Sequence, residues 1–178
     1  MEANNTVKPI ASNLGVVLGI SLTLFIILIY AFNLELITEW YIGIIEFLII
    51  VILGGYACSK AKKHFTEPFT FKNSFSAFFI TIAIGLAIYS LVNYILFNFV
   101  DPEAANYIVE VSIEKVRETM SSFGGTEEQI NQVVADMQNE NQFSLSNQAI
   151  GLAVKLVFYS VIGLLVALIF KEKSNQVA

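Results

Sequence analysis

Four long runs of apolar residues limit what this chain can fold into. They cover about residues 10–32, 40–59, 75–99 and 149–170. A helix of about 20 apolar residues, rising 1.5 Å per residue, crosses the ~30 Å hydrocarbon core of a bilayer. A backbone inside lipid must satisfy its own hydrogen bonds, so each run is expected to be a helix. The sequence therefore predicts an all-α integral membrane protein whose spans form a four-helix bundle.

The composition supports a membrane protein. Of the 178 residues, 56% are hydrophobic and only 14% are charged, whereas about a quarter of a soluble domain is charged. The net charge of −5 argues against nucleic acid as a partner. We treat residues 1–178 as one membrane domain. The first run follows Lys8, as in a signal peptide, but it is too long and lacks a small-residue cleavage site, so we expect it to be retained.

Charged residues between the runs differ in sign from loop to loop. The loop after the second run contains Lys60, Lys62, Lys63, His64 and Lys72, and Lys171 follows the last run. By the positive-inside rule these segments and both termini are cytoplasmic, while residues 33–39 and 101–146 lie outside. The lysines of the loop, Lys60, Lys62, Lys63 and Lys72, are also candidate contacts for anionic lipid head groups, although a topology signal is the simpler interpretation.

The segment 101–146 is acidic, with nine acids and two bases. Asp101-Pro102 is typical of a helix start, and Thr126 with Gln129 is typical of a second one. Gly124-Gly125 should separate the two helices. We expect an extracytoplasmic helical hairpin that projects into solvent and offers a surface to a protein partner. Its helices should pack through four apolar residues, Val116, Met120, Ile130 and Val133.

Two charged residues interrupt the apolar runs, Glu46 in the second and Lys155 in the fourth. Each lies six residues inside its run, or about 9 Å deep, and Asn93 lies at a similar depth in the third run. We predict that Glu46 and Lys155 pair, with Asn93 close by. The pair could stabilise helix packing or act as a functional relay. Alternatively, Lys155 could extend alone to the membrane interface.

Gly15-x-x-x-Gly19 in the first run lets another helix backbone approach closely. A dimer contact is one use of this face. Packing against another helix of the same chain is the interpretation that we favour.

Several segments together resemble a known family. These are the entry Phe69-Thr70-Phe71-Lys72-Asn73-Ser74-Phe75, the exit Asn98-Phe99-Val100-Asp101-Pro102-Glu103, the acidic insert and the ending Leu168-Ile169-Phe170-Lys171. The chain is similar over nearly its whole length to the bacterial four-span family catalogued as domain of unknown function 4199. The resemblance implies a multi-pass protein of the bacterial inner membrane and assigns no reaction to any residue.

The motifs of common enzyme classes are absent from the sequence. There is no Gly-x-Ser-x-Gly, His-Glu-x-x-His or Cys-x-x-Cys, and Cys58 and His64 are single. We therefore predict no enzyme, no cofactor and no metal site. A small scaffold or partner-binding membrane protein is the favoured function. The alternative is a proton- or ion-coupled transporter or channel component that uses Glu46, Asn93 and Lys155.

Overall fold

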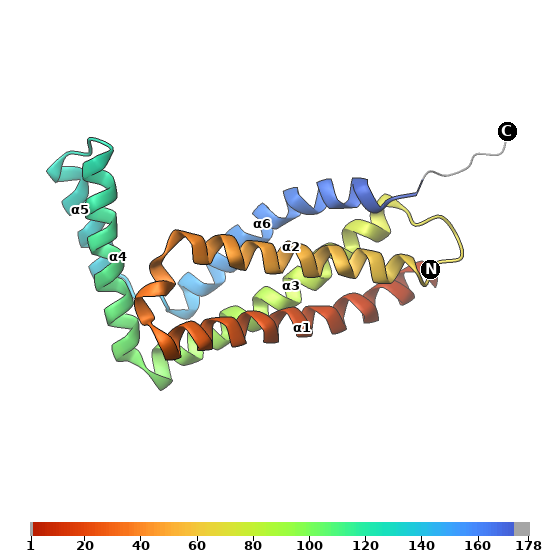
Figure 1. Cartoon of the computed structure of the whole chain (residues 1–178), viewed down its shortest axis with the longest axis horizontal. Coiled ribbons are helices and arrows are strands. Elements are labelled where there is room, and N and C mark those ends of the chain that lie inside the picture. The colour runs from red at the N-terminus through yellow and green to blue at the C-terminus, as the bar shows by residue number, and fades with distance from the viewer. Residues whose placement is uncertain (1, 173–178) are drawn as a thin grey trace.

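The computed structural model describes residues 2–172, with the backbone alone for residues 2–5. Six α-helices and two short helical segments follow one another: α1 (Glu2–Phe32), η1 (Leu34–Thr38), α2 (Trp40–Lys62), α3 (Phe71–Ile95), η2 (Leu96–Val100), α4 (Pro102–Ser122), α5 (Glu127–Asn139) and α6 (Leu145–Phe170) (Figure 1). Residues 2–172 contain no strand, so the predicted all-α class is confirmed.

Four helices are long and apolar enough to cross a membrane. Their spans are Thr6–Phe32, Trp40–Lys62, Phe71–Val100 and Leu145–Phe170. The third and fourth helices begin about one turn before the apolar runs at residues 75 and 149, because polar caps extend them. Thr70 accepts a hydrogen bond from the Asn73 amide, and Ser144 accepts one from the Asn147 amide. The first helix starts so early that it includes Pro9, which the hydropathy pattern placed before it.

Helix α3 is the centre of the bundle, because it packs against α1, α2 and α6. Its Phe78 is fully buried between two glycines of the neighbouring helices. A Cβ atom placed on Gly54 of α2 would come within 2.7 Å of the Phe78 ring, and one on Gly163 of α6 within 2.8 Å. The absence of these side chains lets three helices meet around one aromatic ring.

The small-residue face of α1 packs against α3 of the same chain. A Cβ atom on Gly15 would lie 2.7 Å from Ile84, and one on Gly19 would lie 2.7 Å from Ile88. The Thr81 hydroxyl donates a hydrogen bond across this contact to the Ala11 carbonyl, at 3.1 Å. The intramolecular interpretation is therefore correct. Helix α3 thus covers both glycines in the described chain, and a dimer contact through this face stays a prediction.

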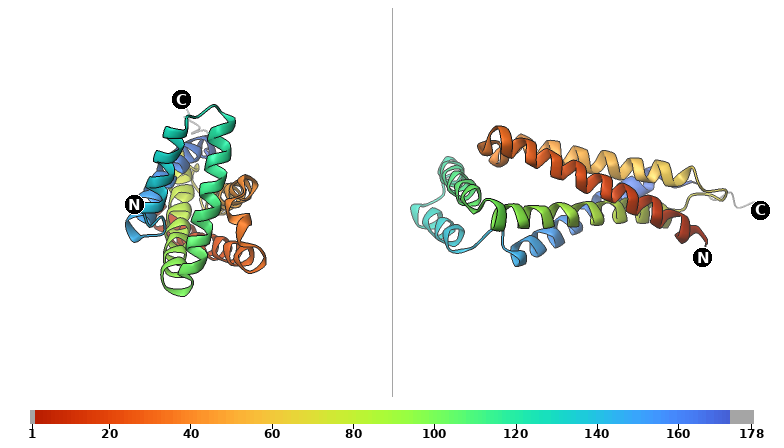
Figure 2. Two further views of the ribbon diagram at one scale, coloured as in Figure 1. Left: turned by 90° about the vertical axis from the view of Figure 1, so that its left-hand side faces the viewer. Right: turned by 90° about the horizontal axis from the view of Figure 1, so that it is seen from below.

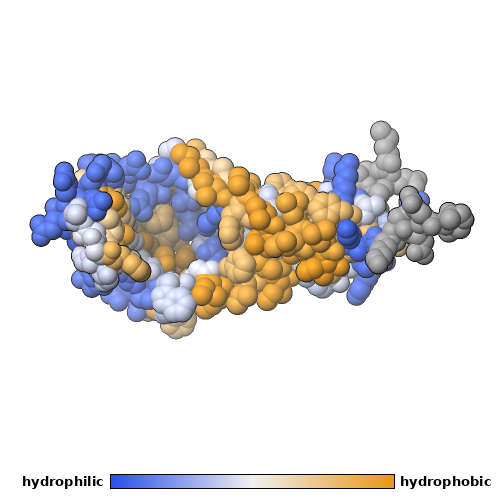
Figure 3. Space-filling model, turned by 90° about the horizontal axis from the view of Figure 1, so that it is seen from above, coloured by the Kyte–Doolittle hydropathy of each residue, from blue (hydrophilic) through white to orange (hydrophobic). Residues whose placement is uncertain are grey.

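On the face that Figure 3 shows, the surface of the bundle is apolar in the middle and hydrophilic toward both ends. Large apolar side chains such as Leu24, Ile52 and Val157 are more than half exposed. A surface of this kind is stable in lipid and is rare on a soluble monomer. The chain is thus a multi-pass membrane protein.

Helices α4 and α5 form a hairpin that lies across one end of the bundle, transverse to the spans (Figures 1 and 2). We call this end the hairpin side. The other end, where the 63–70 loop lies near the start of α1 and the end of α6, is the basic side. Polar contacts fix α4 to the bundle, as described below, and the sequence did not predict this attachment.

The hairpin turn has the predicted chemistry. Gly124 has a φ of +79°, and Thr126 forms the capping box with Gln129. The packing of the hairpin differs from the prediction at one position on α5. Ile130 and Val134 are buried, whereas Val133, which was expected in the contact, is 37% exposed. Val134 lies one turn after Ile130 and so faces the same side of the helix.

Candidate functional site between α2, α3 and α6

Helices α2 and α6 pack through Phe78 near the basic side and leave a cavity between them near the hairpin side. The buried face of α2 includes Ile50, Gly54 and Ala57. In the other direction this face continues to Glu46 and Gly43, as the helical repeat requires. A Cβ atom on Gly43 would meet nothing within 4 Å, in contrast to the tight contact at Gly54.

The cavity has a volume of about 340 Å³. It extends from Glu39, Trp40 and Gln148 near the helix ends to Glu46 and Lys155 deeper in the bundle. Its remaining lining includes Tyr89, Ser90 and Asn93 of α3. The predicted polar cluster therefore lines one cavity, although it was expected inside a packed bundle.

The predicted contact between Glu46 and Lys155 is present. Their Oε1 and Nζ atoms are 3.6 Å apart, and the side chains are 20% and 46% exposed. This distance exceeds the ~2.7–2.9 Å of a strong charge-assisted hydrogen bond. Within residues 2–172, the buried Oε1 of Glu46 has no hydrogen-bond partner. The two charges attract each other, but they retain the capacity to bind another polar group.

Asn93 lies near the charged pair without bonding to it. Its side chain is 7% exposed and donates a hydrogen bond to the Tyr89 carbonyl of its own helix, at 2.8 Å. The Tyr89 ring has a more direct role, because the Lys155 ammonium lies 5.4 Å from its centroid. This cation–π contact was missed from the sequence. The four-residue spacing of Tyr89 and Asn93 is the signal that could have identified it.

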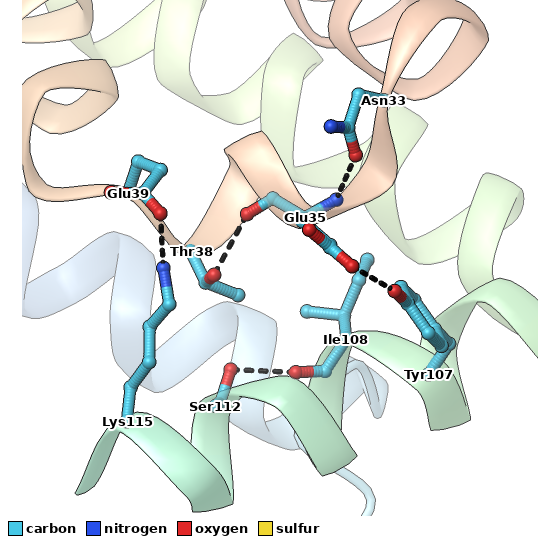
Figure 4. A network of polar contacts seen from close by, with 8 residues as sticks. All are labelled: Asn33, Glu35, Thr38, Glu39, Tyr107, Ile108, Ser112 and Lys115. Atoms are coloured by element: carbon cyan, nitrogen blue, oxygen red, sulfur yellow. Dashed lines mark hydrogen bonds and ion pairs between the residues drawn. The ribbon is translucent and has the colours of Figure 1, made fainter. Parts of the chain in front are cut away.

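Polar contacts fix the hairpin to the link between α1 and α2 (Figure 4). Lys115 of α4 forms an ion pair with Glu39, and the Tyr107 hydroxyl donates to Glu35 Oε1 at 2.6 Å. The Glu35 carboxylate raises the pKa of Tyr107, because the hydrogen bond favours the protonated phenol. Both glutamates could be identified in the sequence, but their distant partners could not.

A third contact lies at the start of α4. The Tyr30 hydroxyl donates to Asp101 Oδ2 at 2.6 Å, and the Ala104 amide donates to Oδ1 at 2.9 Å. These two hydrogen bonds lower the pKa of Asp101. The residue thus caps α4 and also joins it to α1.

A groove of about 660 Å³ lies between α4 and the segment 137–143, where η2 closes its bundle end. Its floor includes Phe97 and Phe143, whose ring centroids are 4.4 Å apart. Its sides combine apolar groups, such as Ile113 and Met137, with side-chain amides and the carboxylates of Glu110 and Glu140. Phe97 and Phe143 also line the smaller cavity, so the two spaces adjoin.

The lysines of the basic side differ in their surroundings. Lys62 pairs with Glu172 at 3.1 Å, while Lys60, Lys63 and Lys72 are exposed. Glu172 also accepts a hydrogen bond from the Phe69 amide. That bond and Lys62 lower the pKa of Glu172. Lipid head-group contacts of the four lysines stay a prediction.

Of three comparisons with known proteins, the one with protein families finds a match. Neither a search of curated proteins nor a search of solved structures finds a match. The family described as protein of unknown function (DUF4199) matches residues 13–172. This match includes most of the first apolar span, the other three spans and the hairpin, and it agrees with the resemblance noted in the sequence. The chain therefore belongs to the DUF4199 family.

Proposed function

We propose that this protein is a non-enzymatic scaffold of the bacterial inner membrane that binds a partner polypeptide in the groove beneath its hairpin. The observation that carries the proposal is the attachment of α4 to the bundle by side-chain contacts. Three side-chain contacts from separate positions, Asp101, Tyr107 and Lys115, hold it across the bundle end. A groove held open in this way is pre-organised, which lowers the entropic cost of binding.

The chemistry of the groove favours a basic partner segment. Glu110 and Glu140 line it, and the rest of the hairpin adds an excess of acids. Of the two bases of the segment 101–146, Lys115 is already paired with Glu39. Complementary charge speeds association and selects partners, while the apolar groups of the floor contribute buried area.

The proposed orientation places the hairpin outside the cytoplasm. The basic side contains Lys60, Lys63 and Lys72, and the start of α1 and the end of α6 lie at the same end (Figure 1). Under the positive-inside rule, this end and both termini are cytoplasmic. The partner would therefore be an extracytoplasmic protein or the outer domain of another membrane protein.

Site-specific photo-crosslinking in intact cells tests the proposal. A photoreactive residue at Met137, which lines the groove, should give one adduct of defined mass, whereas one at Phe123 should not. Phe123 lies at the hairpin turn, is 88% exposed and does not line the groove.

Glu110→Lys should abolish the Met137 adduct, and Glu118→Lys, an equivalent change on α4 outside the groove, should leave it. Equal effects of the two reversals would contradict binding in the groove.

A proton- or ion-conducting component is the second candidate function, and the cavity beside Glu46 and Lys155 is the observation that favours it. Proton flux into proteoliposomes separates the two. A scaffold should give no flux above protein-free vesicles for either the wild type or Glu46→Gln. Flux that the Glu46→Gln substitution removes would establish conduction instead.

A further inference from the structure

We propose that the cavity between α2, α3 and α6 binds the head group of an amino-phospholipid from the membrane leaflet on the hairpin side. Lys155 would contact the phosphate and Glu46 the primary ammonium group. The inference is independent of the partner groove, and it holds for either orientation of the protein in the membrane.

The charged groups of the cavity match a molecule that carries both signs. Glu46 and Lys155 lie 3.6 Å apart, and Glu46 Oε1 accepts no hydrogen bond from residues 2–172. A carboxylate and an ammonium group with free bonding capacity are costly at this depth in a membrane. A ligand with one phosphate and one primary ammonium supplies an opposite charge to each. Ser90 and Gln148 add polar groups to the same lining.

The surroundings of Lys155 favour a lipid as the source of the head group. Lys155 is 46% exposed and lies next to lipid-facing side chains of α6. An apolar hollow on the same helix is lined by Ala153, Val154, Val157 and Phe158. An acyl chain attached to a head group in the cavity could lie along this hollow. A soluble zwitterion would gain nothing from it.

The size of the cavity also suits a head group. Its volume of about 340 Å³ lies at the lower end of the ~300–1,000 Å³ typical of small-molecule sites. Trp40 at its rim is 74% exposed, as expected for an indole at the head-group level of the bilayer. The cavity therefore extends from the membrane interface down to the charged pair.

Lipid binding to the purified full-length protein, followed by native mass spectrometry, tests the proposal. The probes are phosphatidylethanolamine, phosphatidylcholine and phosphatidylglycerol with identical acyl chains. The wild type should bind phosphatidylethanolamine about tenfold more tightly than phosphatidylcholine, because three methyl groups remove the N–H donors that face Glu46. Equal binding of the three lipids would overturn the site.

Single substitutions distinguish the two charges. Glu46→Gln should abolish the preference for phosphatidylethanolamine over phosphatidylcholine and should not weaken the binding of phosphatidylglycerol. Lys155→Gln should lower the affinity for all three lipids about tenfold, because the phosphate group of each lipid loses its ammonium partner. An unchanged preference in Glu46→Gln would contradict the proposal.

A matched pair of glycine variants tests the cavity without changing a charge. Gly43 lines the cavity and Gly151 does not, yet a Cβ atom at either position would meet nothing within 4 Å. Gly43→Leu should fill the cavity and remove the lipid preference, while Gly151→Leu should retain it. Preference retained in both variants would show that the lipid binds elsewhere.

Glycerophosphoethanolamine, the same head group without acyl chains, identifies the source of the ligand. At millimolar concentration it should not displace phosphatidylethanolamine from the wild type. Displacement at micromolar concentration would make a soluble solute the ligand and overturn the assignment to a lipid.

Discussion

Glu46 and Lys155 are separated in sequence by more than a hundred residues, and the bundle brings their charged atoms to 3.6 Å. Glu46→Ala would leave Lys155 without its partner, so it should destabilise the protein more than Glu46→Ala combined with Lys155→Ala. The expected coupling energy is about 0.5–3 kcal/mol. A double-mutant cycle on thermal unfolding in detergent measures it. Additive losses would show that the two charges do not interact.

Two glycines of α2 should respond oppositely to the same substitution. Gly54→Ala should destabilise the protein by about 1–3 kcal/mol, because the new methyl group would overlap the Phe78 ring, which Gly163 holds from the other side. Gly43→Ala should be neutral or stabilising by up to about 1 kcal/mol, since alanine favours the helix and the site is open. Unfolding of the two variants in the same detergent provides the comparison.

At the scale of the elements, the hairpin depends on the left-handed backbone of Gly124. Gly124→Ala should destabilise the hairpin by about 1 kcal/mol, because a side chain is disfavoured at a φ of +79°. Gly124→Asn should have a smaller effect, since asparagine tolerates this conformation. Amide hydrogen exchange should show faster opening of α5 in the alanine variant. Equal exchange in the two variants would argue against strain at this turn.

The attachment of α4 should weaken in acid. Hydrogen bonds from Tyr30 and Ala104 depress the pKa of Asp101 in the folded state, so the stability that they contribute is present above the ordinary pKa of about 3.9. It is lost as the pH falls through the depressed value. The distance between spin labels on α1 and α4 should therefore widen below about pH 4. Tyr30→Phe should flatten this pH dependence, and an unchanged profile would contradict the assignment to Asp101.

The elements that sequence predicts well are those that local chemistry decides. The helix caps at Thr70, Asp101, Thr126 and Ser144 form within three residues, and the apolar runs identify the spans. The transverse hairpin depends on Lys115 reaching Glu39 across 76 positions. The cavity exists because α2 and α6 pack on the Phe78 ring near the basic side and leave space between them near the hairpin side. Such contacts follow from how the helices cross, which hydropathy does not encode.

At the scale of the whole molecule, the orientation in the membrane can be measured directly. In a Cys58→Ser background, a cysteine at Glu128 of the hairpin should react with an impermeant thiol reagent on intact cells. A cysteine at Lys63 should react only after the membrane is opened. Both positions are exposed, so access to the reagent depends on the side of the membrane. The reverse pattern would invert the proposed topology.

The central position of α3 also affects biogenesis. Spans enter the bilayer in the order in which the ribosome makes them, and helices associate after they insert. The α1 and α2 helices therefore precede the helix against which both of them pack. Until residues 71–95 emerge, the Gly15 and Gly19 face has no covering helix and can contact other nascent membrane proteins. Slow translation of the segment between α2 and α3 would prolong this interval and favour misassembly, although the finished protein has the same sequence.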